Sequence, residues 1–242
     1  MLQLIRAHES FASTKKSPAQ KKNTNAAPKA SPAKSPSVKV AEKRKERPPE
    51  YKGDPQHKDN SFREFRRLVA NIAETSSYLN KTELVRNFFA KGSDKTKFQG
   101  DLYVWVRLLL PGVVKRIYNL QNKQLVKIFS RIFNSDESAM LTDLEAGDVA
   151  ETVSSFFSES NSSIVPAKKA TLNLHQIDEF LDTLTEQTKE DDQFKTLSAM
   201  ATKCTVNDLN MVVKLIKGDL RMHAGCVLTI IIRHTSSVNL IF

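Results

Sequence analysis

Apolar side chains recur through residues 61–225 at the three- and four-residue spacing of one helix face. Two such stripes begin at Leu174 and Leu209. The clearest stripe follows Asn122 and consists of Leu125, Ile128, Phe129, Ile132 and Phe133. A half-buried strand would instead alternate apolar and polar residues, so this spacing predicts helices. We therefore expect an all-α fold, a compact multi-helix domain of about eight to ten short helices.

Helix starts are predicted where a capping residue stands three positions before an acidic residue. The capping side chain can accept a hydrogen bond from a first-turn amide, and the acid lies at the positive end of the helix dipole. Four such pairs occur: Ser61/Glu64, Asn80/Glu83, Thr188/Asp191 and Thr205/Asp208. Helix ends are predicted by glycine and proline between the periodic segments, at Gly92, Pro111-Gly112 and Gly147.

The composition of the chain changes at about residue 60. From Ser13 to about Asp59 the sequence is rich in Lys, Pro, Ala and Ser, and large apolar residues are almost absent. Such a segment buries too little surface to offset the entropy lost on ordering. We expect residues 1–60 to be a disordered basic tail and residues 61–225 to be the helical domain.

Two targeting signals are possible within this tail. The cluster Lys43-Arg44-Lys45 is typical of nuclear localisation, and it fits a solubilising charge run equally well. The weakly amphipathic segment Met1–Ala12 suggests a mitochondrial presequence, against which Glu9 and the single Arg6 argue. We expect a nuclear protein, with the mitochondrion as the alternative. The longest apolar run, Cys226–Ile232, is too short to cross a membrane, so no membrane partner is expected.

The net charge of +10 is distributed unevenly along the chain. Residues 1–60 hold 14 Lys and Arg against 6 Asp and Glu, and residues 61–135 hold 14 against 5. Residues 136–221 hold 8 Lys and Arg against 16 Asp and Glu. A basic half beside an acidic half suits a polyanion bound to one face, or salt bridges between the two halves of one globule.

Two groups of basic residues are candidate polyanion contacts. The first lies opposite the apolar stripe of the helix after Asn122, with two further cations before it; its members are Lys123, Lys127, Arg131, Lys115 and Arg116. The second surrounds Gly218, where backbone amides and cations can approach a phosphate together; its members are Lys214, Lys217 and Arg221. The alternative interpretation of either group is a solvated helix face.

Catalytic and metal-binding patterns are absent from the sequence. There is no nucleophile elbow, no Walker phosphate loop and no Lys-x-Asp-Gly, and the histidines are scattered singly. The two cysteines, Cys204 and Cys226, have neither zinc-site nor disulfide-framework spacing, and we interpret them as reduced thiols of an intracellular protein. We expect no covalent catalysis by this chain alone, no cofactor and no metal site.

Several long strings within residues 61–225 carry a family resemblance. They are residues 108–113 (LLLPGV), 118–120 (YNL), 123–134 (KQLVKIFSRIFN), 143–149 (DLEAGDV), 179–181 (EFL), 188–191 (TKED), 207–209 (NDL) and 215–222 (LIKGDLRM). In this order they closely resemble the N-terminal DNA-binding domain of eukaryotic ATP-dependent DNA ligases, most closely that of DNA ligase III. The resemblance covers about two-thirds of the chain.

The resemblance implies a compact helical fold that grips nicked double-stranded DNA through minor-groove, sugar and phosphate contacts, in DNA repair and recombination. It also implies that Lys217 and Arg221 contact phosphate, whereas the role of Lys123, Lys127 and Arg131 is inferred from periodicity. In the full-length family the cofactors are ATP and Mg²⁺, and the ligase catalytic core is the partner of this domain.

The chain departs from the family pattern in three respects. DNA ligase III carries a zinc finger before this domain, which two cysteines cannot build. The adenylation lysine of Lys-x-Asp-Gly is missing. Residues 226–242 do not resemble the family's continuation, so we expect a separate C-terminal tail that results from a truncated gene model, a retained intron or a short isoform.

The favoured hypothesis is therefore the nick-recognising, DNA-binding portion of a DNA ligase. A complete ligase activity is an alternative, and the missing adenylation lysine argues against it for this chain. A helical scaffold that binds an acidic protein partner is a second alternative, because the same basic surfaces would serve it.

Overall fold

The computed structural model describes residues 53–111, 116–160 and 162–222. These residues form nine α-helices and one short 3-10 helix, and their only β-type pairing is an isolated bridge between Ser61 and Asn173. The predicted all-α fold is confirmed. The basic tail up to residue 52, both targeting signals and the C-terminal tail lie outside the described residues.

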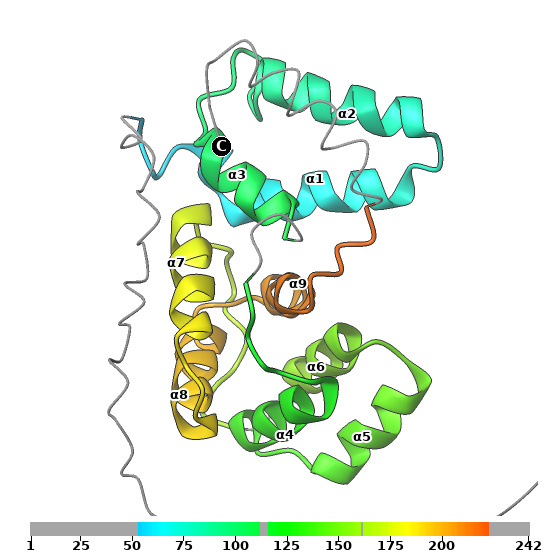
Figure 1. Cartoon of the computed structure of the whole chain (residues 1–242), viewed down its shortest axis with the longest axis vertical. Coiled ribbons are helices and arrows are strands. Elements are labelled where there is room, and N and C mark those ends of the chain that lie inside the picture. The colour runs from blue at the N-terminus through cyan, green and yellow to red at the C-terminus, as the bar shows by residue number, and fades with distance from the viewer. Residues whose placement is uncertain (1–52, 112–115, 161, 223–242) are drawn as a thin grey trace, which may run out of the picture. The chain divides into compact units, whose positions relative to one another are not determined.

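The helices form two groups of three, with the last three helices packed against both groups (Figure 1). The first group is α1 (Phe62–Glu74), α2 (Tyr78–Lys91) and α3 (Leu102–Leu109), and the second is α4 (Asn122–Phe133), α5 (Glu137–Ala146) and α6 (Val149–Ser158). Helix α7 (Leu174–Thr185) contacts α1 and α3, and α8 (Glu190–Ala201) contacts α4. Helix α9 (Val206–Lys217), seen end-on in Figure 1, lies between the groups and contacts α1 and α6.

An aromatic cluster fills the core of the first group. Trp105 of α3 is fully buried, and its ring lies among four phenylalanine side chains, those of Phe65, Phe88, Phe89 and Phe98. The nearest is Phe88, whose ring centroid is 4.7 Å from that of Trp105. The indole N–H of Trp105 donates a hydrogen bond of 2.8 Å to the backbone oxygen of Asp59, so the one polar atom of this ring is satisfied.

The folded chain begins before Ser61, within the segment that we expected to be tail. The buried carboxylate of Asp59 accepts hydrogen bonds from the backbone N–H and the hydroxyl of Ser93 and from the backbone N–H of Gln99, at 2.7, 2.5 and 2.8 Å. Burial by itself raises the pKa of Asp59, but these hydrogen bonds outweigh it and hold the pKa below its ordinary value. Composition did not predict that this segment is folded, because it is held to residues 93–99 by one buried carboxylate and not by a run of apolar residues.

Asp59 and the backbone of Lys97 lie so close to residue 92 that only glycine fits at this position. Gly92 has φ +66°, in the left-handed region, and a Cβ atom there would lie 2.8 Å from a carboxylate oxygen of Asp59 and 2.9 Å from the backbone oxygen of Lys97. The predicted stop at Gly92 is confirmed, since it follows α2 directly.

The core of the second group is built on α4 and α6. The predicted apolar stripe of α4 is buried throughout, and the ring of Phe129 stacks on that of Phe133 at 5.4 Å. Phe133 in turn stacks on Phe157 of α6 at 5.1 Å. The apolar face of α9, including Leu209 and Val212, is buried as the periodicity predicts.

Helix α9 is joined to α1 through the fully buried carboxylate of Asp208. One oxygen of Asp208 accepts hydrogen bonds from the backbone N–H and the hydroxyl of Thr205, at 3.0 and 2.7 Å, which completes a capping box. The other oxygen lies 2.7 Å from Nε of Arg66 on α1 and forms a buried ion pair with it. The predicted cap at Thr205 is thereby confirmed.

The remaining predicted caps differ in accuracy. Ser61 caps α1, because its hydroxyl accepts from the backbone N–H of Glu64 at 3.3 Å. The prediction at Asn80 was wrong, because Ser77 caps α2 instead and Asn80 lies inside the helix. The prediction at Thr188 was one residue early: Lys189 stands at the N-cap of α8 and makes no side-chain capping bond.

Truncation of Phe129 to alanine should destabilise the domain by about 3–5 kcal/mol, because the variant leaves a cavity in the stacked core of α4 and α6. Chemical denaturation followed by circular dichroism measures this free energy. Lys123→Ala, at an exposed position of the same helix, is the matched control and should change stability by less than about 0.5 kcal/mol. Wild-type stability of the Phe129 variant, combined with weaker DNA binding, would contradict a core position.

Candidate nucleic-acid interface

The basic face of α4 points outward as its periodicity predicts. Two of its three cations, however, are already paired with an acidic residue of α8. Nζ of Lys127 lies 2.9 Å from one carboxylate oxygen of Glu190, and Arg131 donates to the other oxygen at 3.0 Å. The hydrogen bond from Lys127 lowers the pKa of Glu190 below its ordinary value, and the positive charge of Arg131 adds to this. The guanidinium of Arg131 also lies 4.7 Å from the ring centroid of Phe194.

Lys123 differs from the other two cations of α4. It lies exposed in the first turn of the helix, and within the described part of the chain it has no hydrogen-bond or ion-pair partner. Lys115 lies outside the described residues.

Arg116 belongs to a partly buried network of two arginines and two aspartates. Its side chain is 9% exposed, and its guanidinium lies 2.5 Å from Asp178 and 2.8 Å from Asp182 on α7. Arg107 of α3 reaches the same two carboxylates, at 3.0 and 2.7 Å. The network therefore ties α3 and the segment after it to α7.

The pKa values in this network follow from burial and from its opposite charges. Burial by itself lowers the pKa of Arg116, but the hydrogen bonds and charges of Asp178 and Asp182 outweigh it and raise the pKa. Burial raises the pKa of Asp178 above its ordinary value, although Arg116 and Arg107 oppose this shift. Arg107 and the two aspartates were not among the residues predicted from the sequence. Asp178 and Asp182 are four residues apart, so they lie on one face of a helix. This spacing is the sequence signal that could have predicted a common basic partner for the two aspartates.

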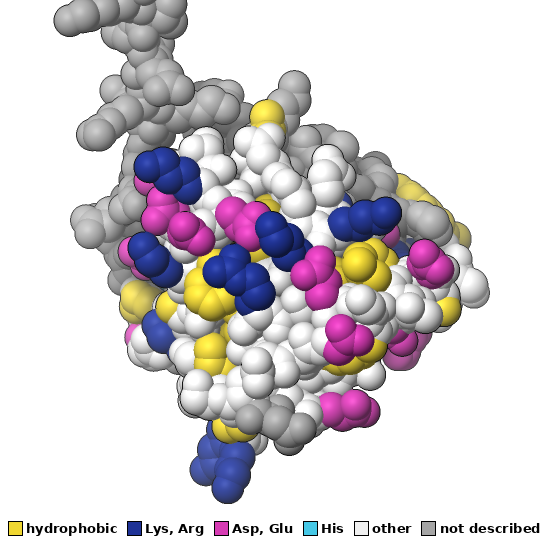
Figure 2. Space-filling view, turned by 90° about the horizontal axis from the view of Figure 1, so that it is seen from below, with side chains coloured by type: hydrophobic (Ala, Val, Ile, Leu, Met, Phe, Trp, Pro, Cys, Tyr) yellow, Lys and Arg dark blue, Asp and Glu magenta, His cyan; other side chains and the backbone are white. Residues whose placement is uncertain are grey.

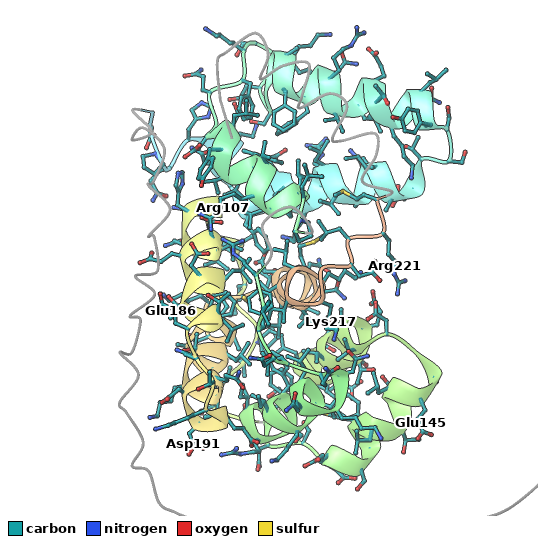
Figure 3. The ribbon with its side chains drawn as sticks, viewed as in Figure 1. Arg107, Glu145, Glu186, Asp191, Lys217 and Arg221 are labelled. Carbon is teal, nitrogen blue, oxygen red and sulfur yellow. The ribbon has the colours of Figure 1, made fainter. Side chains whose placement is uncertain are left out.

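The second predicted group of cations, Lys214, Lys217 and Arg221, lies where the C-terminal end of α9 is beside the N-terminal end of α6. Lys214 donates to Glu151 at 3.0 Å, and Arg221 donates to Asp148 at 2.8 Å. The hydrogen bond from Lys214 lowers the pKa of Glu151 below its ordinary value. Lys217 donates to the backbone oxygen of Leu120 at 3.5 Å, which places the end of α9 next to the start of α4. Figure 3 shows Lys217 at α9 and Arg221 on the chain that leaves this helix.

The turn after α9 leaves its backbone open. Gly218 ends the helix in the left-handed conformation, with φ +68°, and a Cβ atom at this position would meet nothing within 4 Å. Arg221 is also left-handed, with φ +52°, and its backbone N–H donates to the carboxylate of Asp219 at 3.2 Å. The turn therefore leaves open space between Lys217 and Arg221, although the backbone N–H groups of Gly218 and Asp219 already donate to the backbone oxygens of Leu215 and Lys214.

Charge on the visible surface is mixed rather than segregated. Figure 2 shows the face seen from below, on which Lys and Arg side chains are interspersed with Asp and Glu side chains. The pairs formed by Glu190, Asp148 and Glu151 are examples of such matching. Opposite charges interspersed at this scale cancel much of the field that a single-sign patch would produce.

Metal binding and thiol chemistry have little support among the described residues. Within them, no group of three or more His, Cys, Asp and Glu side chains could hold a metal ion. The same residues include no helix of the length and apolar character that a membrane span needs. Cys204 is a buried free thiol, and burial raises its pKa, which opposes formation of a nucleophilic thiolate.

Residues 61–231 match the family model described as the DNA ligase N terminus. The chain belongs to the DNA ligase N-terminal family. Among its relatives, the DNA ligase of Fowlpox virus (strain NVSL) is 43% identical over 166 residues, which cover 68% of this chain and 29% of the viral protein. The DNA ligase of Variola virus is 44% identical over 165 residues, which cover 68% of this chain and 28% of that protein. DNA ligase 3 of Dictyostelium discoideum is 33% identical over 168 residues, which cover 69% of this chain and 14% of that protein.

This ligase N-terminal chain thus spans less than a third of the length of these relatives. The family match extends to residue 231, past residue 225, where we expected the helical domain to end and the C-terminal tail to follow from residue 226. Every predicted contact that the structure describes lies within the matched residues.

Replacement of Arg116 by alanine should destabilise the domain by about 1–3 kcal/mol, because Asp178 loses its closest cation and keeps only Arg107. Thermal and urea unfolding measure the loss. Arg86→Ala, which breaks an exposed pair with Glu83, is the matched control and should cost at most about 1 kcal/mol. Wild-type stability with reduced DNA affinity would instead support the direct DNA contact that the sequence predicts for Arg116.

Proposed function

We propose that this chain is the DNA-binding portion of an ATP-dependent DNA ligase. In this proposal the domain grips nicked duplex DNA by minor-groove and phosphate contacts during DNA repair and recombination. Membership of the ligase N-terminal family supports the proposal. Adenylation and sealing, with ATP and Mg²⁺, are assigned to the catalytic core of the full-length family, which acts as the partner of this domain. A nuclear location is also proposed, on the cluster Lys43-Arg44-Lys45.

The observation that carries this proposal is the end of α9. Lys217 and Arg221 flank a glycine turn with no side chain over it, so a phosphate can approach both cations closely. Contacts of this kind hold the DNA backbone without reading bases. A protein that must bind a break in any sequence needs this type of contact.

The other predicted contacts contribute unequally in this proposal. Lys123 is assigned a full phosphate contact, because no acidic residue among the described ones is paired with it. Lys127 and Arg131 are half-exposed and shared with Glu190, so we assign them a smaller share of the binding energy. Lys115 and Arg116 remain proposed on sequence alone, and Lys214 lies beside Glu151.

The double substitution Lys217→Ala with Arg221→Ala should weaken binding to nicked duplex without unfolding the domain. Each lost phosphate contact should lower the magnitude of the slope of log affinity against log salt by roughly 0.9. Gel shifts or fluorescence anisotropy over a salt series measure this slope. The matched control is Arg86→Ala with Lys195→Ala, which removes the same charge at exposed positions of α2 and α8 and should leave the slope nearly unchanged.

An unchanged slope in the Lys217 and Arg221 variant would remove both residues from the interface. If the wild-type chain shifts neither nicked nor intact duplex but binds an acidic protein, the scaffold alternative replaces the proposed function.

Incubation of this chain with labelled ATP and Mg²⁺ should yield no covalent protein–AMP adduct. The printed sequence contains no Lys-x-Asp-Gly, whose lysine takes the adenylate in the family that it resembles. Gel electrophoresis followed by autoradiography detects such an adduct. A labelled band at the mass of the chain would show that another residue takes the adenylate.

A further inference from the structure

The first turn of α6 places two carboxylates against two cations at the end of α9. The closer pair joins Asp148 to Arg221 at 2.8 Å, and the other joins Glu151 to Lys214 at 3.0 Å. Asp148 has a second task, because its other carboxylate oxygen accepts from the backbone N–H of Ala150 at 3.0 Å and caps α6. Its carboxylate is therefore fixed in place, whichever way Arg221 points.

Arg221 is free to leave this pair for another anion. Its side chain is 59% exposed, and the second ion pair that it makes among the described residues, with Asp219 at 3.7 Å, involves a carboxylate that is itself 63% exposed. Lys214 is only 21% exposed, so it is less able to move away from Glu151. Exposed ion pairs are weak, whereas a phosphate of duplex DNA offers the same contact together with release of condensed counterions.

We propose that Asp148 competes with DNA for Arg221, and that a backbone phosphate displaces its carboxylate when the domain binds. This inference rests on the proposed DNA-binding function. In the free protein the carboxylate of Asp148 stands where the phosphate later binds. Asp148 thus acts through Arg221: it lowers the affinity of the domain for duplex DNA and favours its release.

The test is Asp148→Asn, which removes the charge and keeps the cap, since asparagine caps helices as well as aspartate does. The dissociation constant for nicked duplex, measured by anisotropy at low salt, should fall about two- to fivefold, the range expected for loss of an exposed competing ion pair. The melting temperature should stay close to that of the wild type. The matched control is Glu145→Gln, an equal change of charge on α5 at an exposed residue with no ion-pair partner among the described residues, and its effect should be smaller.

The effect of Asp148→Asn should also depend on Arg221. In an Arg221→Ala background, the same substitution should leave the affinity unchanged, because no cation remains for the carboxylate to hold. Weaker binding by Asp148→Asn would mean that Asp148 orients Arg221 for DNA rather than competes for it, and would overturn the inference. An unchanged affinity, an equal gain with Glu145→Gln, or a gain that persists without Arg221 would overturn it as well.

The proposed function and this inference fail in distinguishable ways. A wild-type chain that does not bind nicked duplex overturns both. A wild-type chain that binds, with an affinity that Asp148→Asn leaves unchanged, overturns only the inference.

Discussion

The placement of the candidate interface depends on the buried carboxylate of Asp208, at the opposite end of α9. One oxygen closes the capping box with Thr205, and the other lies 2.7 Å from Arg66 of α1. Because α9 contacts both α1 and α6, this ion pair helps to set how the two helix groups meet. A buried ion pair adds little stability by itself, but separating its partners leaves a buried charge unpaired, which disfavours arrangements that move α9 away from α1. Lys217 and Arg221 occupy defined positions because the start of their helix is fixed in this way.

Much of the fold could be predicted because its signals are local. The stripe of α4 and the cap at Thr205 are contained within single segments of sequence, and both are present in the structure. The error at Asn80 has a different origin. Ser77 and Asn80 both satisfy the capping rule, and the choice between them depends on where the chain leaves α1, which no local pattern records. The same limit applies to Asp59, whose partners lie 34 and 40 residues away.

The candidate site was less predictable, because charge pairing between helices is a tertiary property. Periodicity placed Lys127 and Arg131 on an outward face, but their partner Glu190 lies 63 and 59 residues further along the chain. The unequal charges of residues 61–135 and 136–221 left two interpretations open, a polyanion surface or salt bridges between the halves. The pairs made by Arg107 and Arg116 with α7 belong to the second interpretation. The open turn at Gly218 supports the first, so both apply to different parts of one molecule.

The segment before α1 bears on where this domain truly begins. The family match starts at Ser61, whereas the chain is already folded at Asp54, whose backbone oxygen accepts from the side chain of Asn60. Asn60 accepts in turn from the backbone N–H of Asp101 at 2.7 Å, and Asp59 satisfies the indole of Trp105. A fragment cut at the similarity boundary would therefore lose partners of the aromatic core while keeping every residue by which the family is recognised. Sequence likeness marks what relatives share, and the physical unit that folds is longer by the few residues that close its core.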